Sequence, residues 1–275
     1  MRILITGGGG QLGHDLHEVL VEHEVESFDH SGLDITDPDA VFRAVDRITP
    51  DWVINAAAFN DVDGAETAAD QAFAVNAIGP GNLAEAAAGS SAAMMHISTD
   101  YVFDGRKGSP YTESDTPNPL SVYGRSKYEG ELRVLGSGEN TMVVRTAWLY
   151  GRYGKNFVTA IRAGATRGSP LRVVADQVGS PTATLDLARA IAQLITSPIR
   201  GLLHAVNAGS CSRYEFARAI VSIGTEIIPI TSAEAARPAP RPRNATLVSE
   251  RWHLTGIDPL RPWEDALKDF LRTIP

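Results

Sequence analysis

The chain has 275 residues, of which 43% are apolar and 21% are charged, and its formal net charge is −8. This length is enough to bury a full core in one large domain or in two unequal ones. The acidic balance argues against nucleic-acid binding, which requires clustered basic residues, and the single cysteine excludes a disulfide framework and a cysteine-based zinc site. No signal segment precedes the first apolar run and no run approaches the ~18 residues of a membrane span, so we expect a cytoplasmic protein without a membrane partner.

Short apolar segments alternate with helix-like segments through the first half of the chain. The expected strands cover residues 2–6, 25–28, 52–56, 94–98 and 142–146. The expected helices cover residues 12–23, 40–49, 65–76, 78–89 and 126–135. This alternation predicts an α/β protein with a Rossmann-like, doubly wound parallel sheet whose crossovers are right-handed.

The pattern is looser in the second half. Helices are expected over 156–167 and 186–196, and extended segments over 171–175 and 201–207. The proline-rich stretch 237–243 suits neither a regular helix nor a central strand. It is either a linker or a loop that reaches over the substrate, and its position before a final helix-like segment favours the loop. We therefore expect an NAD(P)-binding domain over residues 1–150, to which residues 183–208 return, and a smaller, mainly substrate-binding lobe over residues 151–275.

A glycine-rich turn follows the first expected strand and precedes the first expected helix. Gly8, Gly10 and Gly13 satisfy G-x-G-x-x-G, and Gly7 in place of Gly8 satisfies the looser G-x-x-G-x-x-G. In a dinucleotide-binding fold such glycines let the backbone approach a pyrophosphate, which the free N–H groups of the helix N-terminus attract. The candidate cofactor contacts in the turn are Gly7, Gly10, Gln11, Leu12 and Gly13.

Asp29 ends the second expected strand, 19 residues after Gly10. A carboxylate there accepts hydrogen bonds from the adenosine ribose hydroxyls, which favours NADH over NADPH. A solvated aspartate at a strand end is the alternative, and His30 and Ser31 would tolerate a phosphate. We place Asp34 and Ile35 near the adenine.

Tyr123 and Lys127 are four residues apart on an expected helix, so their side chains share one face. A tyrosine with an ordinary pKa of about 10 needs a nearby cation to act as an acid or base at neutral pH, and Lys127 supplies that cation. Thr99 comes at the end of an expected central strand, where such folds bind ligands. Its hydroxyl would donate to a carbonyl oxygen that gains negative charge; Ser98 is the competing candidate.

Six motifs together resemble a known family. They are the glycine turn, Asn55-Ala-Ala-Ala58, Ser98-Thr-Asp-Tyr-Val-Phe103, Tyr123-Gly-Arg-Ser-Lys127, Arg145-Thr-Ala-Trp-Leu-Tyr-Gly151 and Asp176-Gln-Val-Gly-Ser-Pro-Thr182. With them, the chain from Arg2 to about Leu271 resembles the extended short-chain dehydrogenase/reductase family, and within it the dTDP-4-dehydrorhamnose reductases.

The resemblance implies NAD(P)H-dependent reduction of the C4 ketone of dTDP-4-dehydro-L-rhamnose, a dTDP-sugar substrate, to dTDP-L-rhamnose by a monomer or homodimer. It implies Thr99, Tyr123 and Lys127 as the catalytic residues, with Tyr123 protonating the new alkoxide. The further cofactor contacts that it implies are Ala56, Ala57, Ala58, Asn76 and Lys127. The substrate contacts that it implies are Val62, Asp63, Thr99, Asp100, Tyr101, Tyr123, Trp148, Asn156, Gln177 and Arg241.

Departures from the family pattern affect the metal and the pocket. Some relatives bind magnesium at a dimer interface with a glutamate just beyond the third glycine. Asp15 stands there in this chain, which puts both Mg²⁺ and that dimer in doubt. The usual Tyr-Thr-x-Val-Asp is here Phe59-Asn-Asp-Val-Asp63, and Ala245 replaces a common serine.

Other activities of the same fold stay open as alternatives. Another nucleotide-sugar 4-ketoreductase is one alternative, and an epimerase is a weaker one. A dehydratase is disfavoured because Tyr101 stands where those enzymes place a glutamate. A noncatalytic NADP-binding role, as in the regulatory subunit of methionine adenosyltransferase, would need no functioning trio.

Overall fold

The computed structural model describes residues 1–168, 170–221 and 224–274. Its centre is a parallel six-stranded sheet with the order β10-β5-β4-β3-β1-β2. The strands are β1 (Arg2–Thr6), β2 (Glu24–Phe28), β3 (Trp52–Asn55), β4 (Ala93–Thr99), β5 (Thr141–Thr146) and β10 (Gly201–His204). The helices around it are α1 (Gln11–Val19), α2 (Pro38–Ile48), α3 (Ala69–Phe73), α4 (Gly79–Gly89), α5 (Val122–Gly136) and α7 (Thr184–Leu194). The predicted α/β class and doubly wound sheet are confirmed.

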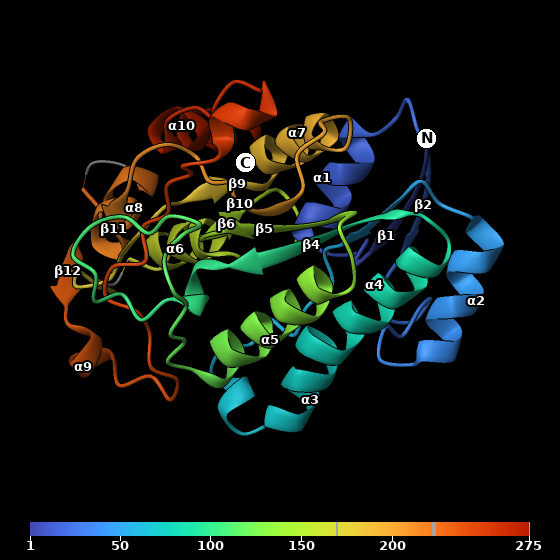
Figure 1. Ribbon diagram of the computed structural model, residues 1–275. Helices are drawn as coiled ribbons and strands as arrows, with labels where there is room; N and C mark the ends of the chain where they lie inside the picture. The colour runs from blue at the N-terminus through green and yellow to red at the C-terminus, as the bar shows by residue number, and fades with distance from the viewer. Residues whose placement is uncertain (169, 222–223, 275) are drawn as a thin grey trace.

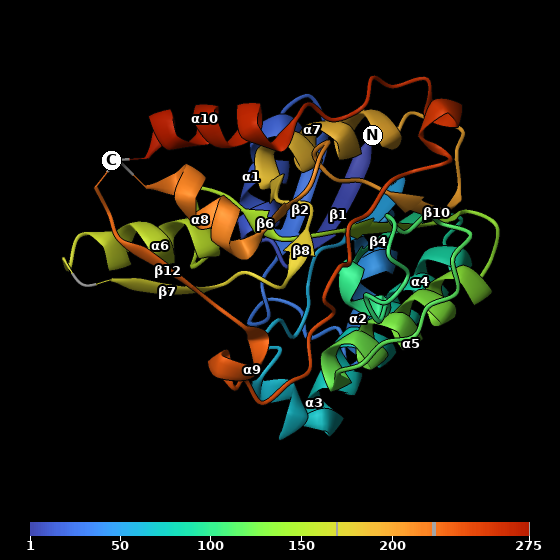
Figure 2. The ribbon, with the colours of Figure 1, turned by 90° about the vertical axis from the view of Figure 1, so that its left-hand side faces the viewer.

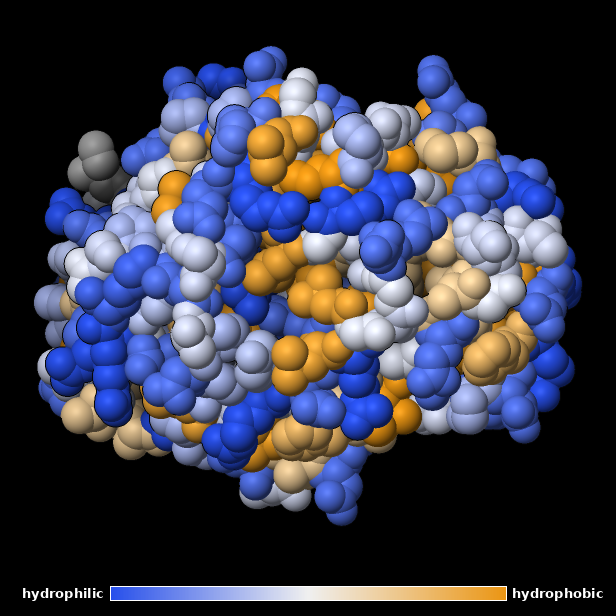
Figure 3. Space-filling model, viewed as in Figure 1, coloured by the Kyte–Doolittle hydropathy of each residue, from blue (hydrophilic) through white to orange (hydrophobic). Residues whose placement is uncertain are grey.

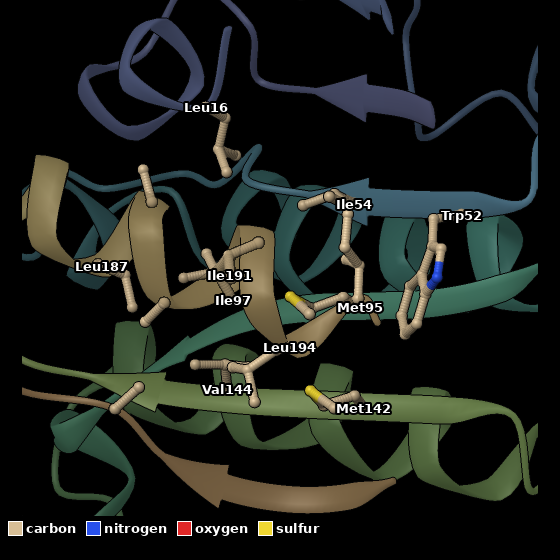
Figure 4. Packing of buried hydrophobic residues seen from close by; sticks show 14 of the residues in the cluster. Leu16, Trp52, Ile54, Met95, Ile97, Met142, Val144, Leu187, Ile191 and Leu194 are labelled. Atoms are coloured by element: carbon tan, nitrogen blue, oxygen red, sulfur yellow. The ribbon is translucent and has the colours of Figure 1, made fainter. Parts of the chain in front are cut away.

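Helices cover both faces of the sheet (Figure 1). α1 packs with α7 on one face, and α2, α4 and α5 pack on the other. Figure 4 shows the first of these layers, in which Leu16 of α1 and Leu187, Ile191 and Leu194 of α7 meet apolar side chains of β3, β4 and β5. The strands β1, β3, β4 and β5 are buried along almost their whole length because both faces of the sheet are covered, and the sequence accordingly reads there as largely apolar runs. The carboxyl ends of β1, β3, β4 and β5 consequently meet at one edge of the sheet.

The remaining elements form a smaller body (Figure 2). They are β6 (Leu149–Tyr150), α6 (Phe157–Ala165), β7 (Leu171–Val174), β8 (Val178–Gly179), β9 (Thr182–Ala183), β11 (Cys211–Ser212), α8 (Arg213–Ile220), β12 (Ile227–Ile230), α9 (Ser232–Ala235) and α10 (Trp263–Thr273). Tyr150, Phe216, Trp263 and Phe270 centre a separate apolar cluster there. The division of the chain near residue 150 stays a prediction.

Two predicted helices differ from the structure. The first was expected to continue to residue 23 but ends at Val19, because the chain turns after the Leu20 cap and Glu24 already begins β2. The second, over 65–76, is divided into the 3₁₀ turn Gly64–Glu66, α3 and a π-helical turn at Ala74–Ile78 that leads into α4. The stretch 237–243 is irregular, as its prolines predict.

No helix in the described parts of the chain is both long and apolar enough to span a bilayer. Figure 3 shows apolar residues near the centre of one face, surrounded by hydrophilic ones. The large apolar side chains that are exposed come from separate elements, among them Phe42 of α2 and Leu132 of α5.

Candidate active site

The three predicted catalytic residues come from two neighbouring elements. Thr99 is the last residue of β4, and Tyr123 and Lys127 lie in the first two turns of α5. α5 begins where it does because the Ser121 hydroxyl caps it, accepting a hydrogen bond from the Gly124 N–H at 3.1 Å. All three catalytic candidates line one cavity of about 400 Å³. The structure therefore brings together the residues that the motifs predict.

The tyrosine is neutral in this setting. Burial raises the pKa of Tyr123 above its usual range, and the Thr99 hydroxyl only partly opposes that shift. The Tyr101 ring packs edge-on against the Tyr123 ring, with centroids 5.5 Å apart. A buried, protonated phenol is suited to donating a proton to an oxygen that becomes an alkoxide.

The lysine is almost completely buried. Lys127 Nζ donates to the Ile97 carbonyl oxygen at 2.7 Å and lies 3.2 Å from His96 Nε2. Burial lowers the pKa of Lys127 to about 7, against the smaller opposing effect of Glu131. Lys127 can therefore change its protonation near neutral pH.

The glycine turn has the form that a dinucleotide requires. Gly7 has φ +78°, and a Cβ there would lie 2.5 Å from the Ala57 nitrogen. A Cβ on Gly13 would lie 2.4 Å from the Gly7 carbonyl oxygen. Gly10 is the N-cap of α1 and has no side chain, so no capping side chain accepts hydrogen bonds from the first N–H groups of the helix. The turn fits a nucleotide diphosphate at the helix N-terminus.

A second cavity, of about 480 Å³, continues from this turn. The predicted cofactor residues that line it are Gly7, Gly10, Asp29, Asp34, Ile35, Ala56, Ala57 and Ala58. Gln11, Leu12 and Gly13 line the catalytic cavity instead. Gly10, Ala56, Ala58 and Asn60 belong to both cavities, so a dinucleotide can extend from one to the other.

The acidic residues of the second cavity are held by local hydrogen bonds. Asp29 Oδ1 accepts from the Ser31 N–H at 2.9 Å, the Ser31 hydroxyl at 2.7 Å and the Gly32 N–H at 3.0 Å. These bonds hold the pKa of Asp29 below its usual value. Asp34 Oδ1 accepts from the Thr36 N–H and hydroxyl in the same way. Asp29 is therefore a fixed carboxylate at the end of β2.

Asn76 lies outside the lining of both cavities. Its side chain bonds both backbone groups of Phe59, at 2.8 and 3.1 Å, and the Ser126 hydroxyl at 3.0 Å. Asn76 sits in the π-helical turn, which orients it toward the loop that follows β3. It holds that loop against α5, and its contact with the cofactor stays a prediction.

The predicted substrate residues fall into two groups. Those that line the catalytic cavity are Val62, Thr99, Asp100, Tyr101, Tyr123 and Trp148. Those outside its lining are Asp63, Asn156, Gln177 and Arg241. Asn156 caps α6 and donates to Gln11 Oε1 at 3.0 Å, and Gln177 donates to the Ser232 hydroxyl at 2.9 Å.

Asp63 and Arg241 contact each other. Two guanidinium nitrogens of Arg241 donate to the two carboxylate oxygens of Asp63, each at 2.9 Å. The Ala239 N–H adds a third bond to Asp63 at 3.1 Å. This forked ion pair fastens the 237–243 stretch to the loop after β3, beside the catalytic cavity.

Motif reading missed Arg213, the first residue of α8, which also lines the catalytic cavity. Its guanidinium carbon lies 3.5 Å from the centroid of the Trp148 ring, and no side-chain hydrogen bond to Arg213 is present among the described residues. Gly179 makes room for the indole, because a Cβ there would lie 2.5 Å from it. Nothing local in the sequence marks Arg213, since α8 reaches the cavity only through the tertiary fold.

Asp100 is the other unusual group of the cavity. It is 2% exposed, and its Oδ2 has no hydrogen-bond partner among the described residues. Oδ1 accepts from the Thr99 hydroxyl at 3.0 Å. Burial raises the pKa of Asp100 to about 7. An unpaired carboxyl oxygen beside the catalytic hydroxyls suits a substrate hydroxyl.

Comparison with known proteins agrees with this geometry. A family described as the RmlD substrate binding domain matches residues 1–274. The dTDP-4-dehydrorhamnose reductase of Mycolicibacterium smegmatis is 44% identical over 99% of this chain and 86% of its own length. A probable dTDP-4,6-dihydroxy-2-methyloxan-3-one 4-ketoreductase of Streptomyces antibioticus is 43% identical over 98% of this chain and 94% of its own length. The crystal structure of dTDP-4-dehydrorhamnose reductase from Bacillus anthracis in complex with NADP has a TM-score of 0.96 and 39% identity, and the match covers 99% of both chains. The chain thus belongs to the RmlD family of reductases, which use a nicotinamide cofactor, as the motifs predict.

Proposed function

We propose that the protein reduces the C4 ketone of dTDP-4-dehydro-L-rhamnose to give dTDP-L-rhamnose, with NAD(P)H as hydride donor. The observation that carries the proposal is the convergence of Thr99, Tyr123 and Lys127 on one cavity. That cavity shares Gly10 with the second cavity, which continues from the glycine turn.

The chain's own residues supply the proton and the electrostatic part of the reaction. When bound, NAD(P)H supplies a hydride to the ketone carbon. The Thr99 hydroxyl donates to Asp100 Oδ1 in the free protein; turned to the ketone oxygen, it would stabilise the charge that develops there. Tyr123, held protonated by burial, donates its proton to the alkoxide. Lys127 in its ammonium form stabilises the resulting phenolate.

We propose NADH as the preferred cofactor because of Asp29. Its carboxylate stays ionised at neutral pH and stands at the end of β2. A carboxylate accepts hydrogen bonds from ribose hydroxyls and repels a 2′-phosphate. The relative from Bacillus anthracis is in complex with NADP, so both cofactors belong in the assay.

The cations of the catalytic cavity support a nucleoside diphosphate as part of the substrate. Arg213 and Lys155 line that cavity, and the Arg213 guanidinium stacks on Trp148. Arginine forms forked hydrogen bonds to phosphate oxygens. Arg241 would join them only after its bond to Asp63 loosens.

A reductase for another dTDP-linked keto sugar is the second candidate, because the relative from Streptomyces antibioticus carries such a name. Magnesium binding by Asp15 has less support: its carboxylate accepts a hydrogen bond from the Thr184 hydroxyl and is 1% exposed. Activity that persists in excess EDTA would show that no magnesium is needed. A monomeric or homodimeric state and a cytoplasmic location stay predictions.

The test is the loss of NADH absorbance when the purified protein is mixed with dTDP-4-dehydro-L-rhamnose made in situ. NADPH and the corresponding UDP-sugar are run in parallel. We expect Tyr123→Phe to bind NADH almost normally and to lose at least ~100-fold in kcat, because the proton donor is gone. Tyr128→Phe, on the same helix but outside the cavity lining, is the matched control and keeps its turnover. Full activity in Tyr123→Phe would remove that residue from the mechanism. Tight NADH binding without turnover of any of these sugars would instead favour a noncatalytic role.

A further inference from the structure

A buried chain of hydrogen bonds leads from β1 to the catalytic lysine. Asn55 Oδ1 accepts from the Thr6 hydroxyl at 2.8 Å and from the Ala57 N–H at 3.0 Å. A backbone N–H only donates, so the bond from Ala57 fixes which end of the Asn55 amide is the oxygen. The amide NH₂ therefore points the other way, toward His96 Nδ1 at 3.0 Å.

This orientation selects one tautomer of His96. Because the Asn55 NH₂ donates to Nδ1, that nitrogen must be an acceptor. His96 is fully buried, and burial holds its pKa well below the usual value, so the ring is neutral. A neutral imidazole with an accepting Nδ1 carries its hydrogen on Nε2. That N–H faces Lys127 Nζ at 3.2 Å.

An N–H donor cannot form a hydrogen bond to an ammonium group, which has donors and no acceptor. A neutral amine has a lone pair, which accepts from His96 Nε2–H while the amine donates to the Ile97 carbonyl oxygen at 2.7 Å. We propose that His96 is a positioning residue that holds Lys127 as a neutral amine in the cofactor-free enzyme, and that binding of NADH brings one proton from solvent to Lys127.

The other charged and titratable groups around Lys127 are consistent with a neutral amine that can take up a proton. Glu131, one turn further along α5, is the carboxylate that favours the ammonium. It is already bonded to Arg145 of β5, at 2.9 and 2.6 Å, and to the Ser98 hydroxyl of β4. Tyr123, one turn earlier, is neutral. The pKa of Lys127 is therefore close to neutral pH. A dianionic diphosphate in the glycine turn raises that pKa and so favours the ammonium form.

The proton balance is simple. Lys127 –NH₂ takes up one proton and becomes –NH₃⁺, which can no longer accept from His96 and turns into the cavity that it lines. During reduction Tyr123 gives its proton to the alkoxide, and the ammonium supplies the proton that restores the phenol. The inference rests on the proposed cofactor site and is independent of the sugar.

Calorimetry of NADH binding at pH 8, in buffers of different ionisation enthalpy, measures the proton uptake. We expect nearly one proton per bound NADH in the wild type, since a group with a pKa of about 7 is mostly neutral at pH 8. In His96→Gln the amide can turn its oxygen toward the ammonium, so Lys127 is already protonated and uptake falls below about a fifth of a proton. His204→Gln is the matched control: His204 is 1% exposed and contacts Arg145 and Val248, and its loss leaves the uptake unchanged.

A second measurement addresses the resting state without any ligand. Nitrogen-15 NMR of the cofactor-free wild type reads the tautomer of His96, which we expect to carry its hydrogen on Nε2. A hydrogen on Nδ1, or NADH binding without proton uptake, would overturn the inference. Failure to bind NADH at all would refute the cofactor site instead, and the tautomer would still decide the state of Lys127 in the free protein. The NMR measurement also keeps the test decisive if His96→Gln does not fold.

Discussion

The buried ion pair between Glu131 and Arg145 gives the sharpest stability prediction. Its side chains are 1% and 2% exposed, and the guanidinium bonds both carboxylate oxygens, at 2.9 and 2.6 Å. In Arg145→Met the carboxylate loses this partner and retains only the Ser98 hydroxyl. Removing one member of such a pair costs ~3–5 kcal/mol in the free energy of unfolding, because a charge is left buried and unpaired.

For a chain of this length that loss lowers Tm by about 5–9 °C, at ~2 cal/mol/K of unfolding entropy per residue. The double variant Glu131→Leu/Arg145→Met should recover most of it, since two apolar side chains of similar size leave no buried charge. We expect the double variant to lie within about 1–2 kcal/mol of the wild type, the remainder being the Ser98 hydroxyl left without its acceptor.

Urea denaturation of the wild type, both single variants and the double variant gives the four free energies of unfolding of a double-mutant cycle. A coupling free energy of about 4 kcal/mol or more supports the buried-pair reasoning, because each single loss is ~3–5 kcal/mol and the double loss only ~1–2 kcal/mol. If the two single losses simply add in the double variant, or if Arg145→Met costs less than ~1 kcal/mol, the pair does not stabilise the junction of α5 with β4 and β5.

Three further predictions follow from the cavities. Asp29→Ala should raise the Kd for NADH at least several-fold more than that for NADPH, measured by fluorescence titration; equal losses would defeat the ribose assignment. Gly13→Ala should weaken NADH binding by at least ~10-fold in the same titration, because its Cβ would lie 2.4 Å from the Gly7 carbonyl oxygen, which belongs to backbone and cannot move aside. Burial raises the folded-state pKa of Asp100 to about 7, so the folded state keeps a proton that the unfolded state has released, and stability falls as pH rises from ~4 to ~7. Asp100→Asn should flatten that slope in urea midpoints measured at pH 5 and 8, and an unchanged slope would contradict it.

The parts of the fold that the sequence predicts are those with a local physical cause. The central strands are continuous apolar runs because helices cover both faces of the sheet, and their positions are correct to within one or two residues. The glycine turn is recognisable because backbone contacts exclude a Cβ at Gly7 and Gly13. Residues 64–78 were less predictable: the alanine-rich sequence favours one helix, and the structure bends it so that Asn76 reaches Phe59.

The parts that escaped prediction are pairings between distant segments. Asp63 and Arg241 were each expected to face the substrate, and the structure joins them to each other across 178 positions of the chain. Arg213 reaches the catalytic cavity only because the small body places α8 against Trp148. His96 stands in an apolar strand, where its residue type predicts neither the accepting nitrogen nor the lysine beside it. Such contacts depend on strand order, and no spacing in the sequence encodes it.

The position of α5 shows why the Tyr-x-x-x-Lys motif is insufficient to define the site. Tyr123, Lys127 and Glu131 follow one another at intervals of one helical turn, but only the first two line the cavity. Glu131 lies deeper and binds Arg145 of β5. Gly130 lets the helix approach this closely, because a Cβ there would lie 2.1 Å from the Asn76 carbonyl oxygen. The glycine and the ion pair fix the depth of α5, and that depth sets where Lys127 meets His96, so the acidity of the catalytic lysine depends on residues outside its motif.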